Sequence, residues 1–361
     1  MTRKTRSSCL IGGLLIALTT FAMQTPANAT QTINLTVVSG YPPVAAWVKV
    51  FKDYYVPEVA KRLAKTGNYK INWNEGFSGT IAKPAGELDA VEKGLADIGM
   101  IQTVFHPDKL PLYGIAYATP FVTTDIGLVV RTVNQLTDKF PAMKNGWGKY
   151  NQVFLTTLGT VDDYQVVTTK PIKSLDDFKG LKIGGAGPNL RYLEGLGATG
   201  VASNLVEMYN NLKTGVVDGW VIWAEAAANF KVYEVAPYYV EADLGAVTSI
   251  ALSANKDTWA KLPPEVRTVL ADVAISYADE LAKHVKKTAA ASIKKYVANG
   301  GKVIKLSEAQ RKTWASELPP IGKEWANGLE KDGLPARAVL TTYMDIMRKN
   351  HQPILRNWDK E

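Results

Sequence analysis

The chain has 361 residues, of which 46% are hydrophobic, with one cysteine and a formal net charge of +8. A chain of this length buries a large core without disulfides, so a small disulfide-stapled fold is excluded. Lysine and arginine are spread along the chain and form no dense basic block, which argues against nucleic-acid binding.

Residues 1–29 have the layout of a secretory signal peptide. A basic start is followed by an apolar stretch from Cys9 to Met23 and by the small-residue sequence Ala27-Asn28-Ala29. This order predicts export and cleavage after Ala29, and the apolar stretch is too short for a stable spanning helix. No later run reaches the ~18 apolar residues that span a membrane, so a soluble, periplasmic mature protein is expected.

Cleavage would change the composition of the protein. The signal segment holds three basic residues, no acidic residue and the only cysteine. The mature chain of about 330 residues therefore has no thiol, and its net charge falls from +8 to +5. A mildly basic protein without disulfides must depend on its hydrophobic core.

The first half of the mature chain alternates strand and helix patterns. "TINLTVVSG" predicts a strand over 32–40, because Gly40-Tyr41-Pro42-Pro43 does not easily continue one. A helical pattern follows over 44–55. Further segments are predicted as a strand over 69–76, a helix over 85–96 and a strand over 96–102. Strand, helix and strand joined by short links predict an α/β fold with parallel sheets.

A short helix-to-strand unit occurs twice. In "AVEKGLADIGMI" Gly94 ends a helix and Asp97 precedes an apolar strand, and in "NLKTGVVDGWVI" Gly215 and Asp218 hold the same places. Glycine supplies the left-handed helix cap, and the aspartate is expected to bond the backbone of the turn. Two such units, about 120 residues apart, indicate two similar lobes.

The second half is predicted to become mainly helical. Ser174 is expected to cap a helix, the pattern is helical from Pro263 to about Asn299, and Ser307 with Gln310 forms a capping box. The predicted organisation is a signal peptide over 1–29, lobe 1 over 30–155 with contributions from the C-terminal half, lobe 2 over 156–260, and a helical C-terminal segment over 261–361 that bridges the lobes.

The glycine-rich stretch "KIGGAGPN" (182–189) suggests a phosphate loop at first sight. The dinucleotide-binding pattern requires a third glycine where Leu190 stands, and the Gly-Lys-Ser/Thr of a P-loop is absent. The three histidines are far apart, and no metal-ligand spacing or Gly-x-Ser-x-Gly elbow occurs. We therefore expect no cofactor, no metal site and no enzymatic activity.

Aromatic residues are the remaining signal of a ligand site. Trp220 and Trp223 follow the second helix-to-strand unit, Tyr164 lies near a strand start, and Tyr41 and Phe105 end strands in the first half. Ligands of parallel α/β sheets bind beyond the carboxyl ends of the strands, where such rings can stack on a solute. The alternative is that Trp220 and Trp223 pack a core between the lobes.

Several motifs in a fixed order carry a family resemblance. "IKSLDDFKGLKI", "EGLGATGV" and "VEMYNNLKTGVVDGW", together with "PFV" at 120–122, resemble the DctP-like extracytoplasmic solute receptors of TRAP transporters. The resemblance covers essentially the whole mature chain. It implies a two-lobed α/β periplasmic binding protein fold (type II-like) with a long helical C-terminal segment, which closes around a small solute by a hinge motion and performs no chemistry.

The resemblance also implies partners. The receptor would deliver a small organic solute to the small and large permease subunits, and a monomer is expected. A receptor that presents its ligand to a sensor is the alternative role.

Three departures from the family pattern affect the ligand. Gly184 stands where relatives place an arginine that grips the ligand carboxylate, Tyr164 aligns with a second basic position, and Ile222 replaces a ligand-binding asparagine. Two hypotheses remain, a carboxylate with an apolar or aromatic body and a neutral or cationic solute in an aromatic cage. The residues expected at the ligand site are Tyr41, Phe77, Phe105, Asp163, Tyr164, Gly184, Asn189, Arg191, Trp220, Trp223 and Glu225.

These residues have different expected roles under the two hypotheses. The acid of a carboxylate ligand would be held by Arg191, by Asn189 or by backbone N–H groups of the Gly184–Gly187 loop. Arg191 as a solvated surface residue is the alternative. A cationic ligand would instead use Glu225 or Asp163 as its counter-charge.

Overall fold

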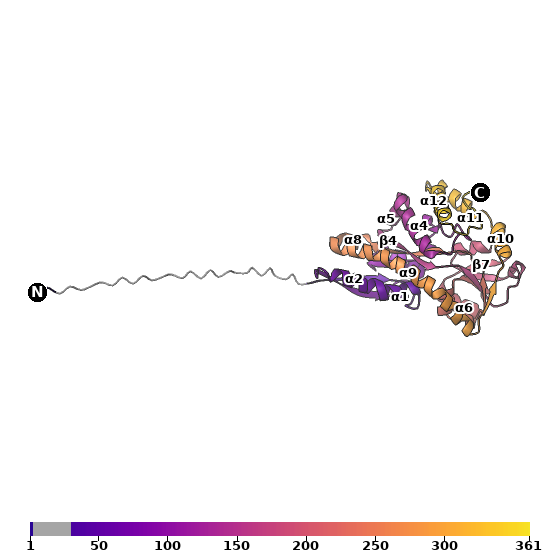
Figure 1. The fold of residues 1–361 in the computed structure, drawn as a ribbon, viewed down its shortest axis with the longest axis horizontal. Helices are drawn as coiled ribbons and strands as arrows, with labels where there is room; N and C mark the ends of the chain where they lie inside the picture. The colour runs from indigo at the N-terminus through magenta and orange to yellow at the C-terminus, as the bar shows by residue number, and fades with distance from the viewer. Residues whose placement is uncertain (3–29) are drawn as a thin grey trace.

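Two mixed β-sheets, one in each lobe, form the framework of the protein (Figure 1). The computed structural model describes residues 1–2 and 30–361, so the predicted signal peptide lies outside the described residues apart from its first two. Lobe 1 is built on a five-stranded sheet of order β2-β1-β3-β10-β4, and lobe 2 on a six-stranded sheet of order β11-β9-β5-β8-β6-β7.

The strands of the two sheets come from both halves of the chain. Those of lobe 1 are β1 (Gln31–Val38), β2 (Tyr69–Gly76), β3 (Ile98–Ile101), β4 (Gln152–Val161) and β10 (Val247–Asn255). Those of lobe 2 are β5 (Gln165–Thr168), β6 (Lys182–Gly185), β7 (Thr199–Ala202), β8 (Gly219–Ile222), β9 (Tyr238–Glu241) and β11 (Lys302–Lys305).

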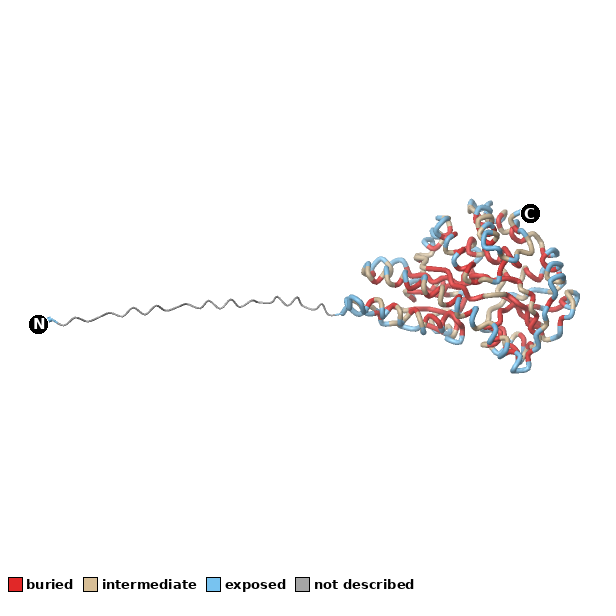
Figure 2. Tube along the Cα trace, in the orientation of Figure 1, coloured by how far each residue is buried: buried red, intermediate tan, exposed pale blue. Residues whose placement is uncertain are grey.

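Helices cover both sheets, and buried residues follow the strands between them (Figure 2). In the first half the α-helices are α1 (Ala46–Val50), α2 (Val56–Leu63), which follows α1 after a π-helical turn, α3 (Glu87–Glu92), α4 (Ile126–Lys139) and α5 (Pro141–Gly148). In the second half they are α6 (Leu205–Lys213), α7 (Ala224–Asn229), α8 (Lys256–Lys261), α9 (Pro264–Ala298), α10 (Glu308–Glu317), α11 (Ile321–Lys331) and α12 (Ala336–Lys349).

The expected parallel sheets are in fact mixed. β1 pairs in parallel with β2 and β3, whereas β10 runs antiparallel to β3 and β4. In lobe 2, β5 runs antiparallel to β8 and β9. The predicted lobe boundary at 155/156 falls inside β4, and β10 belongs to the sheet of lobe 1. The chain therefore crosses between the lobes at the ends of these long strands.

The repeated helix-to-strand unit has the same structure in both lobes. Its glycines have φ of 71° and 73°, as a left-handed helix cap requires. The Asp97 carboxylate accepts from the backbone N–H of Thr36 at 2.8 Å, and that of Asp218 accepts from Lys182 at 2.9 Å. Each aspartate carboxylate therefore bonds the neighbouring strand and not, as expected, the backbone of its own turn. This bond aligns β3 on β1 in lobe 1 and β8 on β6 in lobe 2.

The long helix α9 joins the lobes. It begins at Pro264, whose restricted φ suits the first position of a helix, and it runs for 35 residues. It packs on β4 and α4 of lobe 1 and on α7 and β11 of lobe 2 (Figure 1). The capping box of Ser307 and Gln310 opens α10 as predicted. Within the described chain, no helix combines the length and the hydropathy that crossing a bilayer requires.

Candidate functional site

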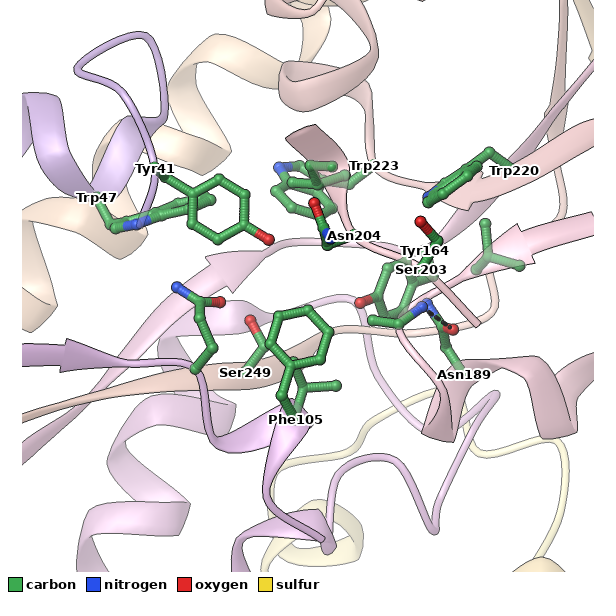
Figure 3. A pocket seen from close by; sticks show the side chains of 15 residues that line it. Tyr41, Trp47, Phe105, Tyr164, Asn189, Ser203, Asn204, Trp220, Trp223 and Ser249 are labelled. Carbon is green, nitrogen blue, oxygen red and sulfur yellow. Dashed lines mark hydrogen bonds between the residues drawn. The ribbon is translucent and has the colours of Figure 1, made fainter. Parts of the chain in front are cut away.

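A small cavity lies between the two lobes, lined by residues of both (Figure 3). Its accessible volume is about 30 Å³, room for about two water molecules, so a solute could enter only if the lining side chains or the lobes move. Lobe 1 contributes Tyr41, Trp47, Gln102, Val104, Phe105 and Ser249. Lobe 2 contributes Tyr164, Ala186, Asn189, Ser203, Asn204, Leu205, Trp220, Val221 and Trp223.

The lobe 1 wall is held rigidly by an aromatic pair. Tyr41 directly follows the turn after β1, and its ring meets that of Trp47 edge-on, with centroids 5.0 Å apart. Trp47 lies on α1, and its backbone carbonyl accepts from the Tyr277 hydroxyl of α9 at 2.6 Å. The helix predicted over 44–55 therefore supplies one wall of the cavity.

Tyr164 stands where the chain enters lobe 2, and its phenol faces the cavity (Figure 3). Its hydroxyl lies 3.1 Å from that of Tyr117, and its ring packs edge-on against Trp223 at 6.1 Å. Burial raises the pKa of Tyr164 to about 12, so the side chain is neutral at physiological pH. A neutral hydroxyl thus occupies the position where relatives were expected to carry a basic residue.

Gly184 does not line the cavity, but it makes room for a residue that does. Gly184 on β6 pairs with Trp220 on β8. A Cβ at position 184 would lie 2.8 Å from Cδ2 of the Trp220 ring and closer still to two other ring atoms. Because real Cβ contacts at that distance do not occur, the glycine is a steric requirement of the tryptophan.

The buried side chain of Asn189 bonds back to the backbone of the glycine-rich loop. Its side chain is 1% exposed, and its Oδ1 accepts from the backbone N–H of Ala186 at 2.9 Å (Figure 3). Gly187 has φ of 88°, which a residue with a side chain rarely adopts. The loop presents Ala186 and Asn189 to the cavity.

Two of the predicted residues lie away from the cavity. Arg191 is paired with Glu194 at 3.2 Å and with Glu324 of α11 at 2.6 Å, so its guanidinium is already engaged on the surface. Phe77 packs edge-on against Phe51 within lobe 1. Neither side chain is among those that line the cavity.

Two predicted carboxylates lie behind the lining. The Asp163 carboxylate accepts from the backbone N–H of Gly245 at 2.9 Å and from Gln165 at 2.6 Å, and burial raises its pKa well above the usual value. Glu225 accepts from Nε1 of Trp223 at 3.2 Å, and burial raises its pKa to about 7. Glu225 supports the lining residue Trp223, and neither carboxylate is among the side chains that line the cavity.

The lining carries no charged side chain. Of the residues that the structure places there, the polar ones are neutral amides, hydroxyls and indole N–H groups. Glu87 lies behind them, where it accepts from the backbone N–H groups of Gly40 at 2.6 Å and of Gln102 at 3.0 Å. No group of three or more potential metal ligands occurs among the described residues. The lining can therefore offer neutral hydrogen-bonding groups and aromatic rings.

Several lining residues were not predicted. Gln102 and Val104 follow β3 at the same strand end as Phe105, a position that the strand-end rule already marked. Asn204 caps α6, accepting from the N–H of Val206 at 2.9 Å, and a helix start at this end of the lobe was a usable signal. The sequence offers no signal for Ser249, because its place depends on the pairing of β10 with strands distant in the sequence.

A family model matches most of the chain. The model of the bacterial extracellular solute-binding proteins, family 7 (DctP), matches residues 55–328. The chain belongs to this family. Family 7 is a family of transport receptors that bind solutes outside the cytoplasm, so the predicted DctP-like class is confirmed.

Individual relatives share the family at modest identity. The ectoine-binding periplasmic protein TeaA of Halomonas elongata is 24% identical over 250 residues, which cover 66% of this chain and 70% of TeaA. The C4-dicarboxylate-binding periplasmic protein DctP of Vibrio cholerae is 26% identical over 175 residues, which cover 48% of this chain and 52% of that relative.

A solved TRAP solute-binding protein shares the fold. The TRAP solute-binding protein of Rhodoferax ferrireducens, in complex with copurified benzoate, has a TM-score of 0.78 at 21% identity. The match covers 88% of this chain and 98% of that protein. It confirms the two-lobed α/β architecture predicted for this chain.

Proposed function

We propose that this protein is a periplasmic receptor that captures a small organic carboxylate with an apolar or aromatic body and delivers it to a TRAP permease. The observation that carries the proposal is the cavity itself. Rings from both lobes, in a family 7 receptor, surround one small uncharged space. The proposed aromatic contacts are Tyr41, Trp47, Phe105, Tyr164, Trp220 and Trp223.

The ring-lined walls suit a flat apolar body. Aromatic pairs favour edge-on or offset contact and add about 0.5–1.5 kcal/mol beyond the area that they bury. Trp220 and Trp223 lie on one side of the cavity in Figure 3, and Phe105 lies across from them. A planar solute between these rings would contact both lobes at once.

Contact with both lobes explains how a ligand would drive closure. A solute that touches lobe 1 and lobe 2 together binds the closed state better than the open one, and it shifts the population towards closure. The closed shape is the form that a permease would recognise. We propose that the partners are the small and large TRAP permease subunits, that the receptor acts as a monomer after cleavage behind Ala29, and that it binds its solute without transforming it.

The acid of the ligand would be held by neutral donors. Arg191 is engaged with Glu194 and Glu324, and no lining side chain is cationic among the residues described. Hydrogen bonds from neutral donors to a carboxylate still stabilise the charged form, by about 1.5–3 kcal/mol each. Asn189 and the N–H groups of the 184–187 loop stay among the proposed donors.

A second candidate ligand is a neutral or cationic solute of the same size. The uncharged ring-lined cavity favours it, since cations are attracted to aromatic faces. Glu225, whose carboxylate accepts from Nε1 of Trp223, would supply the counter-charge. The two candidates therefore differ in the charge of the ligand.

A panel of ligands with one ring and different charges tests the proposal. Thermal unfolding of the purified protein is followed with benzoate, benzyl alcohol and benzylamine, and with mandelate, pyroglutamate and succinate. A ligand at 100 times its Kd raises the free energy of unfolding by about 2.7 kcal/mol. We expect at least one ring-bearing monocarboxylate to stabilise the protein. Stabilisation by benzylamine alone would establish the second candidate, and stabilisation by succinate alone would contradict the role given to the rings.

A further inference from the structure

Two residues that line the cavity each carry a buried N–H donor without a partner. Nε1 of Trp47 and Nε2 of Gln102 have no hydrogen-bond partner among the described residues, although the side chains are only 2% and 4% exposed. Both residues belong to lobe 1. A buried donor without an acceptor costs about 1–3 kcal/mol, so two in one small cavity require an explanation.

Hydrogen bonds hold the backbones of both residues in place. The Trp47 carbonyl accepts from Tyr277 at 2.6 Å, and its ring is fixed edge-on against Tyr41. The backbone N–H of Gln102 donates to the buried Glu87 carboxylate at 3.0 Å. Both side chains are also almost completely buried, so neither donor is the free end of a mobile surface side chain.

We infer that Trp47 and Gln102 together form the acid anchor of the ligand site, each donating one hydrogen bond to the carboxylate of the bound solute. This inference rests on the proposed function. Its new content is the location, because the expected arginine position, Gly184, lies in lobe 2 and the two donors lie in lobe 1. The acid group is then held from the opposite side of the cleft.

The chemistry of the two donors selects the ligand. An indole N–H is a donor only, and the amide nitrogen is also a donor only, so the pair is complemented by an acceptor with two lone-pair sites. A carboxylate supplies two such oxygens. A primary ammonium group would leave both donors unpaired and would add three N–H donors of its own, so the two nitrogen donors disfavour a cation at this end of the cavity.

The test uses Trp47→Phe and Gln102→Met, which remove one donor each and keep an apolar side chain of similar shape. Trp147→Phe is the matched control, because Trp147 is also fully buried in lobe 1, its Nε1 also has no partner among the described residues, and it packs against Tyr113 and Phe154 away from the cavity. Far-ultraviolet circular dichroism verifies that each variant folds.

Affinities are measured by calorimetry with benzoate, mandelate, pyroglutamate and benzyl alcohol. We expect Trp47→Phe and Gln102→Met each to weaken acid binding about 10-fold or more, as loss of a hydrogen bond to a charged group predicts, while Trp147→Phe leaves it unchanged. The acid should also lose more affinity than benzyl alcohol, since a lost ring contact would weaken both equally.

The outcomes separate this inference from the proposed function. If no acid binds the native protein, the proposed function fails, and the anchor fails with it. If an acid binds the native protein and both cavity variants as tightly as it binds Trp147→Phe, only the anchor is overturned.

Discussion

The ring of Trp220 occupies the space into which a side chain at position 184 would project. Gly184 and Trp220 are paired on adjacent strands of lobe 2, and a Cβ at 184 would overlap the indole. The arginine that was expected at position 184 and the tryptophan at position 220 therefore exclude each other. Either residue 184 carries a side chain or Trp220 fills the cavity wall, and this chain has the second arrangement.

Gly184→Ala should therefore destabilise the protein through Trp220. Overpacking of a close-packed interior costs about 1–3 kcal/mol, and the indole must shift to admit the methyl group. In a Trp220→Ala background the same substitution should cost little, because the clash is gone. Urea unfolding of the four proteins of this double-mutant cycle gives the coupling energy, expected at about 1–3 kcal/mol. Equal costs in both backgrounds would show that the backbone, not the ring, excludes a side chain at 184.

Trp220→Ala should lose both stability and ligand binding. Trp220 is 1% exposed and also lines the cavity. The same side chain is therefore both a core residue and a cavity residue, the two roles that the sequence analysis gave as alternatives. Truncation of a buried aromatic costs about 3–5 kcal/mol. Trp220→Phe should retain most of that stability, and its thermal response to the ligand should be weakened but measurable. A Trp220→Ala variant that still binds the ligand with native affinity would remove the ring from the site.

Arg191→Ala should leave ligand affinity within about threefold of the native value. The guanidinium pairs with Glu194 and Glu324, and its side chain is 33% exposed. Pairs of this kind are worth about 0–1 kcal/mol, so the free energy of unfolding should fall by no more than that. Calorimetry with the acid found in the panel and urea unfolding measure the two effects. Loss of acid binding would return Arg191 to the site.

Glu225→Gln should flatten the dependence of stability on pH. Burial raises the pKa of Glu225 to about 7 from the ordinary 4.5, so between these values the folded protein holds a proton that the unfolded chain has released. Unfolding then releases that proton, and a rise in pH favours unfolding. The stability contributed by this group is full below about pH 4.5 and is lost as the pH rises through about 7, a change on the order of 3 kcal/mol.

Urea unfolding at pH 5 and pH 8 measures this effect. The native protein should lose more stability between the two pH values than Glu225→Gln does. Glu194→Gln, which alters an exposed carboxylate, is the control and should follow the native protein. Parallel behaviour of the native protein and Glu225→Gln would show that Glu225 does not hold a proton in the folded state.

Local chemistry made much of the fold predictable from the sequence. The extent of α9 and the capping box at Ser307 and Gln310 follow from residue periodicity and from side chains within one helical turn. The two Gly-x-x-Asp units correctly indicated two similar lobes, because a left-handed glycine is required wherever such a helix ends. The family followed from motifs that are short and continuous.

The makeup of the site was decided by tertiary structure alone. Arg191 is withdrawn from the cavity by Glu324, which lies 133 residues further along the chain. Gly184 meets Trp220 only because β6 and β8 pair in one register. Trp47 and Gln102 share a cavity because α1 and the end of β3 pack together beside lobe 2. Short motifs and local patterns were enough to predict the family and the two lobes, whereas strand register and lobe packing, which depend on distant contacts, decided which side chains line the cavity.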